Sequence, residues 1–473
     1  MKTKLPFTIL NGSLALLLGL SSVQSNAQNP SLNSTPEFKP TINVFASGFG
    51  DYYVKTKADS SGRGAGNVTY KSVPANQSSF ASRRAYLGAD FTFSKNLSGQ
   101  IVLANELQSG GYGVDASGNN VTYVKYAYAK WTNIFPKSNL LIGQIPTPSF
   151  SVFANTDESW GYRSVERTLL DQHNVDASTD FGVALQGRIW EKKNSDSAHI
   201  PTYVGYFISE GNNLAAKDQS STNLAGTSPN TATLNSFKKT RATVFARFLD
   251  EKLTVGAYGD YLRTSLSPFN NENITLKGYI TYKTKWFTIG AEAFRQTNTH
   301  GDVYVSNTGT TVYATTLQTG YSFYLTGSIV PQKLAYFVRY DYYNPDANYN
   351  NSYLYTKTGA LTGAETGASA VATSNATIGA NNFKNYLAYN VFYTQSFYSI
   401  GVDYSPSPRF HIIPNLWYNG YTTVANSGLV GTGSGKYINY TATERNSSDV
   451  VPRITFSYIF NTAKKVSANG RND

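Results

Sequence analysis

The feature that most constrains the fold of this chain is a repeated unit, a segment of about ten residues in which polar and apolar side chains alternate. Sixteen such segments can be read between Ile42 and Phe460, and the connections between them are alternately short and long. Alternation with a period of two is typical of a strand with one apolar and one polar face. The repeat therefore predicts many similar strands in one sheet.

Only helices and closed barrels can satisfy every backbone hydrogen bond in lipid. A spanning helix needs roughly 20 consecutive apolar residues, and no such run follows residue 27. The pattern therefore predicts an all-β fold, a 16-stranded antiparallel transmembrane β-barrel with short periplasmic turns and long extracellular loops.

The connections set the predicted topology of this barrel. Short ones are 94–96, 249–252, 331–333 and 405–408, and the long ones are 55–79, 107–120, 146–179, 211–238, 264–273, 297–319, 343–394 and 419–449. Because long and short alternate throughout, both ends of the barrel are expected on the side of the short turns. In a bacterial outer membrane that side is the periplasm.

The two ends of the chain lie outside the repeat. Lys2, Lys4 and a short apolar run ending in Ser25-Asn26-Ala27 predict a signal peptide over residues 1–27. We expect a flexible lead-in over 28–41, the outer-membrane barrel over 42–460 and a polar C-terminal tail over 461–473. The chain has no Cys, so disulfides and thiol chemistry are excluded.

Charged residues fall on the polar faces of several strands. Residues an even number apart share a face, so Arg84 lies on the same face as Asp90, Asp180 as Arg188, and Arg241 as Arg247. A charge facing the middle of a bilayer costs about 2–4 kcal/mol, so these side chains are predicted to point into a wet lumen. Removing Lys2 and Lys4 from the 40 basic residues leaves 38 against 29 acidic ones, a net charge of +9. This balance favours anionic partners.

The long connection 146–179 carries the densest group of charges and is the candidate constriction loop. Arg163 and Arg167 are four residues apart and can share one helical face, where guanidinium groups suit small anions. Glu166 and Arg167 have a second interpretation, as a pair that ties the loop to the barrel wall. The pore or anion path is thus predicted to include Arg84, Arg163, Arg167, Arg188, Arg241 and Arg247.

Catalysis is not indicated. The spacing of Asp171, His173 and Asp176 is not specific for a metal or for an acid–base pair, and no matching nucleophile motif occurs. The run Gly431–Lys436 differs from a phosphate-binding loop, because Val430 and Tyr437 replace residues that the loop needs. We expect no enzyme activity, no catalytic residues, no metal and no cofactor. Without a basic run or stripe, no nucleic-acid partner is expected either.

Several stretches resemble the phosphate-selective porin O and P family of bacterial outer-membrane porins. Phe80–Gly88 is similar to the family's F-x-x-R-R-A-x-L-G strand, Asp180–Gly187 to its D-x-G-V-x-x-x-G strand, and Glu166-Arg167 to its E-R pair. The match is strongest from Phe80 to Gly211. The resemblance implies a trimeric barrel, a constricting third loop and an anion-conducting lumen. The chain departs from the family in its tail after Phe460 and in lacking a dense ladder of Arg and Lys.

The leading functional hypothesis is an outer-membrane porin for passive diffusion of small hydrophilic solutes, with mild anion preference. The partners are then outer-membrane lipids, small hydrophilic or anionic solutes and two further copies in a homotrimer. One alternative is a solute-specific channel for phosphate or other small anions. The other is a barrel that serves as an adhesin or outer-membrane enzyme, with a filled lumen.

Overall fold

The computed structural model describes residues 38–59, 70, 73–106, 121–149, 159–192, 200–211, 238–266, 269–305, 311–348, 393–423 and 446–462. The chain divides into two units, residues 1–39 and residues 40–473, and the second unit contains all the strands described below. The predicted signal peptide and most of the predicted tail lie outside the described residues, so both stay predictions.

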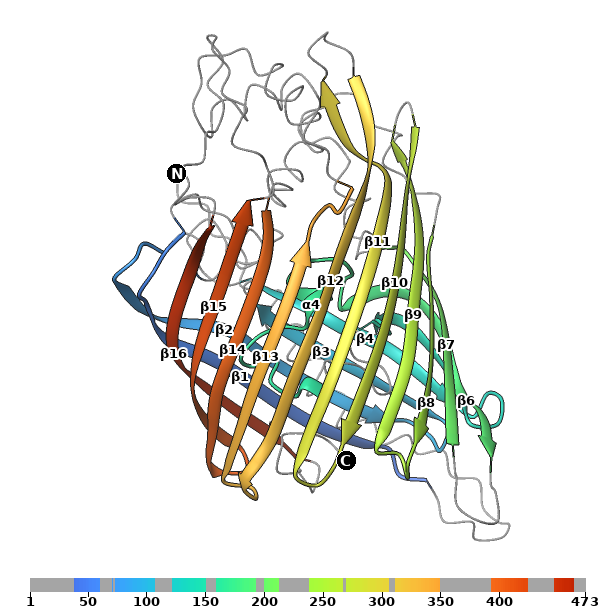
Figure 1. The fold of residues 1–473 in the computed structure, drawn as a ribbon. Helices are drawn as coiled ribbons and strands as arrows, with labels where there is room; N and C mark the ends of the chain where they lie inside the picture. Colours follow the sequence, from blue (N-terminus) through green and yellow to red (C-terminus); the bar gives the residue numbers. More distant parts are fainter. Residues whose placement is uncertain are drawn as a thin grey trace, which may run out of the picture. The chain divides into compact units, whose positions relative to one another are not determined.

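Sixteen antiparallel strands close into one barrel, in which every strand pairs with its neighbour in sequence and β1 pairs with β16 (Figure 1). This confirms the predicted fold class. The strands are β1 Thr41–Lys55, β2 Gln77–Thr92, β3 Leu97–Glu106, β4 Thr122–Thr132, β5 Ser138–Pro146, β6 Thr179–Lys192, β7 Ile200–Ser209, β8 Lys239–Phe248, β9 Leu253–Leu266, β10 Phe269–Lys283, β11 Phe287–Val305, β12 Thr311–Val330, β13 Leu334–Asn344, β14 Tyr393–Ser407, β15 Phe410–Thr423 and β16 Asn446–Asn461.

The closing seam brings both ends of the barrel to the rim that carries the short turns. Phe45 of β1 lies opposite Asn461 of β16. Just beyond them, the Thr462 backbone N–H donates to the carbonyl of Val44 (2.9 Å), and the Val44 N–H donates to Thr462 Oγ1 (2.9 Å). Because closure pairs both edges of the sheet, no strand edge is left open along this seam.

The two faces of the wall have opposite chemistry. Large apolar side chains such as Leu87, Ile142, Phe181 and Ile289 are exposed on the outside. Most of the buried side chains on the strands that face the lumen are polar or charged. A protein surrounded by water shows the reverse arrangement, so the outer belt matches a wall solvated by lipid. Within the described parts of the chain, no helix is long and apolar enough to cross a membrane.

Aromatic side chains mark the turn-side border of this belt. Trp131 ends β4 and Trp286 precedes β11, and both are more than half exposed. Amphipathic rings are favoured at the border between lipid and water.

Two connections that the sequence predicted to be long loops are instead mostly strand. Segment 264–273 contains the ends of β9 and β10, and segment 297–319 contains the ends of β11 and β12. In Figure 1, β11 and β12 rise beyond the neighbouring strands on the loop side. A hairpin that extends past the apolar belt has no lipid-facing side, so it loses the alternation by which strands are recognised in sequence.

Candidate functional site

Loop 3 is the connection 147–178 between β5 and β6, of which residues 147–149 and 159–178 are described. These residues contact the inner face of β2, β15 and β16 at one point and of β8 and β9 at another, with contacts to β11 and β13 between them. The described part of loop 3 therefore lies inside the barrel. That it narrows a passage stays a prediction.

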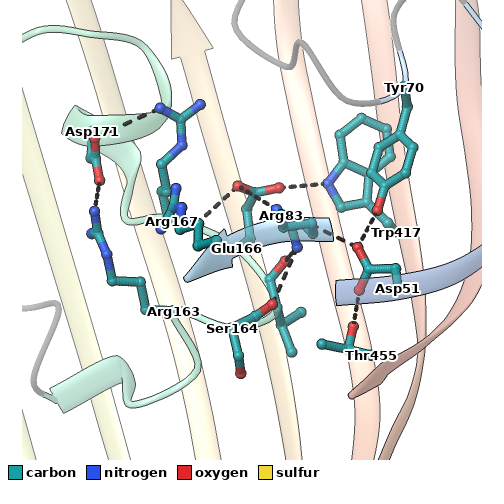
Figure 2. A network of polar contacts seen from close by, with 12 residues as sticks. Asp51, Tyr70, Arg83, Arg163, Ser164, Glu166, Arg167, Asp171, Trp417 and Thr455 are labelled. Atoms are coloured by element: carbon teal, nitrogen blue, oxygen red, sulfur yellow. Dashed lines mark hydrogen bonds and ion pairs between the residues drawn. The ribbon is translucent and has the colours of Figure 1, made fainter. Parts of the chain in front are cut away.

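Glu166 fixes loop 3 to the wall (Figure 2). The indole Nε1–H of Trp417 on β15 donates to Glu166 Oε2 (2.9 Å), and Arg83 Nη2 lies 3.8 Å from Oε1. The Arg167 backbone N–H also donates to Oε1 (2.9 Å). Burial alone would raise the pKa of Glu166, but Arg83, Arg167 and Arg453 outweigh burial and hold its pKa at about 2. Glu166 is therefore ionised at neutral pH.

Backbone carbonyls beside Glu166 accept hydrogen bonds from arginines of the wall. Arg83 Nη1 donates to Val165 O (2.6 Å) and to Ser164 O (3.2 Å), and Arg453 Nη2 donates to Val165 O (2.6 Å). Arg339 on β13 donates to Arg167 O (2.6 Å). Three guanidinium groups from three strands thus satisfy three backbone carbonyls on either side of Glu166, and the Glu166 carbonyl itself accepts from Trp160 Nε1 (3.0 Å).

Tyr70, which lies between β1 and β2 in sequence, joins the same network. Its hydroxyl donates to Asp51 Oδ2 (2.8 Å) and accepts from Arg453 Nη1 (2.7 Å), while its carbonyl accepts from Lys55 Nζ (2.7 Å). Its ring packs edge-on against Trp417. The sequence analysis missed Tyr70, because nothing in a long connection marks one Tyr for insertion into the lumen.

An apolar patch supports the middle of loop 3. A single helical turn, α4 (Leu169–Gln172), buries Leu169 and Leu170 against Phe294 of β11 and Tyr343 of β13. His173 stacks on Tyr343, with ring centroids 3.6 Å apart. Burial, together with the charges of Arg167 and Arg339, lowers the pKa of His173 to about 3, so the ring is neutral at physiological pH.

The far end of loop 3 is held by Asp176. Its carboxylate pairs with Lys239 (2.8 Å) and Arg241 (2.9 Å) of β8 and accepts from the Tyr258 hydroxyl of β9 (2.9 Å). Arg241 also pairs with Asp180 (2.9 Å) and is almost completely buried. Asp176 thus engages Nε and Nη2 of Arg241, while Asp180 and Ser209 of the wall engage its Nη1.

A second group of cations lies where loop 3 faces β2, β3 and β4. Arg84 Nε and Lys125 Nζ lie 4.0 Å and 2.6 Å from Glu106 Oε1. Arg163 Nη2 lies 2.6 Å from Asp171 Oδ2, and Arg167 Nη1 lies 3.7 Å from Asp171 Oδ1. We call these six residues the cationic cluster.

The two halves of the cationic cluster act on one another. Burial raises the pKa of Asp171, but Arg163, Arg167, Arg84 and Lys125 together lower it below its usual value. The cluster holds four cations against two carboxylates, so it keeps a positive balance. Arg84 Nη1 is buried and has no hydrogen-bond partner among the described residues.

The structure thus brings together three of the six predicted anion-path arginines, Arg84, Arg163 and Arg167. The other three lie apart from the cationic cluster. Arg241 belongs to the Asp176 anchor. Arg188 lies opposite Tyr203 in the β6–β7 register, and Arg247 lies over the Tyr203 ring (5.5 Å) towards the turn-side rim. The sequence analysis missed Lys125, although its neighbours Val124 and Tyr126 show the alternation that turns it inward.

Comparison with known proteins reveals a shared fold rather than a shared sequence. No family model and no curated protein sequence matches the chain. Among solved structures, the outer membrane channel DcaP of Acinetobacter baumannii aligns over 91% of this chain and 100% of its own, at 13% identity and a TM-score of 0.51. An anion-selective porin from Comamonas acidovorans aligns over 89% and 100%, at 9% identity and a TM-score of 0.49. The likeness to DcaP shows that the barrel has the fold of an outer-membrane channel.

Proposed function

We propose that this chain is an outer-membrane porin that lets small hydrophilic solutes diffuse passively, with a mild preference for anions. The observation that carries the proposal is the inward fold of loop 3 beside the cationic cluster. A loop across a polar lumen makes a narrow, wet passage, and charges that face confined water act on ions with little screening. Four cations against two carboxylates favour anions there.

The surface of the barrel supports a place in the outer membrane. The apolar belt with Trp131 and Trp286 at its turn-side border suits a bilayer, and the seam puts both barrel ends at the turn rim. We assign that rim to the periplasm. The resemblance to the porin O and P family further supports a homotrimer, which the native mass in mild detergent would test.

A cavity on the turn side of loop 3 supports a wet lumen below the loop. It is lined by Trp160, Tyr162 and Ser164 of the loop and by the turn-side ends and turns of β10 to β16, including Lys333 and His411.

Liposome swelling tests the porin itself. Vesicles that contain the purified protein should swell in small sugars at rates that fall steeply with sugar size, because loop 3 narrows the lumen. A deletion of residues 161–175 should raise the rates for the larger sugars, provided that the variant still shifts on heating in gel electrophoresis. Vesicles that do not swell in any sugar would refute the porin.

A solute-specific channel for phosphate or another small anion is the second candidate. The buried Arg84 Nη1, which has no hydrogen-bond partner in the described part of the chain, favours it, because a guanidinium suits an oxyanion. Low phosphate should then block chloride current, and Arg163→Gln with Arg167→Gln should relieve the block. Undiminished block in the double variant would exclude these two residues as the binding site.

A further inference from the structure

Two consecutive arginines of β2 both point into the lumen, which regular alternation forbids. Phe49 of β1 lies opposite Arg84, but the next β1 residue, Gly50, lies opposite Ser82. Arg83 is therefore the extra residue of a β-bulge. Arg83 and Arg84 are 6% and 5% exposed, while Ser82 on the other side of the bulge is exposed. Without the bulge, one of the two guanidinium groups would face lipid.

Gly50 makes the bulge possible on the partner strand. A Cβ built on Gly50 would lie 2.6 Å from the carbonyl oxygen of Ala81, which is closer than real Cβ atoms come. The backbones of β1 and β2 thus approach too closely for any side chain at this position.

The bulge directs the two arginines to different partners. Arg83 is turned towards loop 3, with its guanidinium on the Val165 and Ser164 carbonyls, 3.8 Å from Glu166 and 3.4 Å from Asp51 (Figure 2). Arg84 is turned towards the cationic cluster.

Arg84 is buried, and its contacts with the described residues leave one nitrogen of its guanidinium without a hydrogen bond. It lies over the Phe49 ring (5.6 Å) and 4.0 Å from Glu106, and its Nη1 has no hydrogen-bond partner among the described residues. One inserted residue thus places two guanidinium groups side by side: that of Arg83 holds loop 3, and that of Arg84 has a buried donor that no described residue pairs.

We infer that the bulge at Arg83 sets the constriction of this barrel: Arg83 is the positioning residue that fixes the distance of loop 3 from β2, while Arg84 stays in the cationic cluster, whose charge acts on the solute. The inference rests on the proposed porin function. It adds a residue that determines selectivity indirectly, by holding the loop that forms the other side of the passage.

The structural half of the inference can be tested without any ion current. Because the chain has no Cys, spin labels can be placed at Ser164→Cys on loop 3 and Lys95→Cys on the β2–β3 turn. In Arg83→Gln the distance distribution should broaden and gain a second component, whereas the neighbouring control Arg84→Gln should leave it unchanged. Equal distributions in the two variants, or no change in Arg83→Gln, would overturn the inference whether or not the protein conducts.

Deletion of Arg83 is the sharpest variant, because it removes only the extra residue. The pairs Phe49–Arg84 and Gly50–Ser82 can then follow one another in a regular ladder, so both strands keep their register. We expect the barrel to form, as judged by its heat-dependent gel shift, and the label distances to broaden as in Arg83→Gln. Unchanged label distances in a folded deletion variant would overturn the inference.

Single-channel recordings test the functional half. Arg83→Gln should increase conductance and open-channel noise. Arg83→Lys should increase both by less than Arg83→Gln does, because lysine keeps the charge but lacks the guanidinium fork. Arg84→Gln should instead shift the reversal potential in the cation direction at unchanged noise. The functional half is wrong if Arg83→Gln changes only the reversal potential while Arg84→Gln changes the open-channel noise.

Discussion

The buried charges of this barrel differ in how completely their neighbours neutralise them. Asp176, Arg241 and Arg453 make several charged or hydrogen-bonded contacts each and serve the architecture. Arg84 keeps a donor that pairs with none of the residues the structure describes. A buried cation with incomplete pairing is a good candidate for contact with a passing anion, because its field is not cancelled locally.

Replacement of Arg84 by Gln should lower the ratio of chloride to potassium permeability, since it removes one of four cations in the cationic cluster. The reversal potential in a salt gradient measures this ratio. Arg247→Gln is the matched control, because Arg247 is near the turn-side rim and pairs with the exposed Glu251 (3.0 Å). An equal shift in both variants would mean that net charge, rather than the cluster, sets selectivity.

Acid should weaken the packing of loop 3 in two stages. The pKa of His173 is about 3 in the folded protein and 6.5 ordinarily, so the unfolded chain binds the extra proton and stability falls as pH drops from about 6.5 towards 3. The pKa of Glu166 is about 2 against an ordinary 4.5, so its stabilisation is lost between about 4.5 and 2. Urea unfolding at a series of pH values measures both stages.

A substitution can separate the two stages. His173→Phe keeps a ring to stack on Tyr343 but cannot take up a proton, so it should remove the first stage and leave the second. A variant that still loses stability from about pH 6.5 downward would show that another group titrates there.

At the scale of elements, loop 3 behaves as a strut fixed at both ends. Asp176→Asn should lower the free energy of unfolding by about 3–5 kcal/mol, because Lys239 and Arg241 would stay buried without their main counter-charge. Urea unfolding followed by heat-dependent gel mobility measures the loss. Glu251→Gln, which breaks the exposed pair with Arg247, should cost at most about 1 kcal/mol. An equal loss of unfolding free energy in Asp176→Asn and Glu251→Gln would contradict the role of Asp176 as an anchor of loop 3.

The strands could be predicted from sequence where one face meets lipid, since only there does polarity alternate. β2 and β8 show this clearly, whereas the loop-side ends of β11 and β12 carried no such signal. The bulge did leave a trace, the tandem Arg83-Arg84, because alternation would put one of the two in lipid. The contacts of Tyr70 with Arg453 and of Trp417 with loop 3 could not be predicted, because they join residues that are far apart in the sequence.

At the scale of the whole molecule, one chain combines a rigid wall with a loop that subdivides it. The barrel pairs the backbone of every strand and has an apolar exterior. Some of its interior charges hold loop 3, and others face the passage. The positive balance of the cationic cluster is local, since buried acids such as Asp176 and Asp260 lie at the other end of the loop. Anion preference should therefore be mild.

The reversal potential of the wild-type protein in a planar bilayer under a salt gradient tests the central claim most directly. We predict ohmic current steps and a potential whose sign shows that chloride permeates better than potassium. The triple variant Arg84→Gln, Arg163→Gln, Arg167→Gln should move that potential to zero or past it. A wild-type potential of the cation-selective sign would contradict the role of the cationic cluster, and membranes that stay silent would contradict the pore.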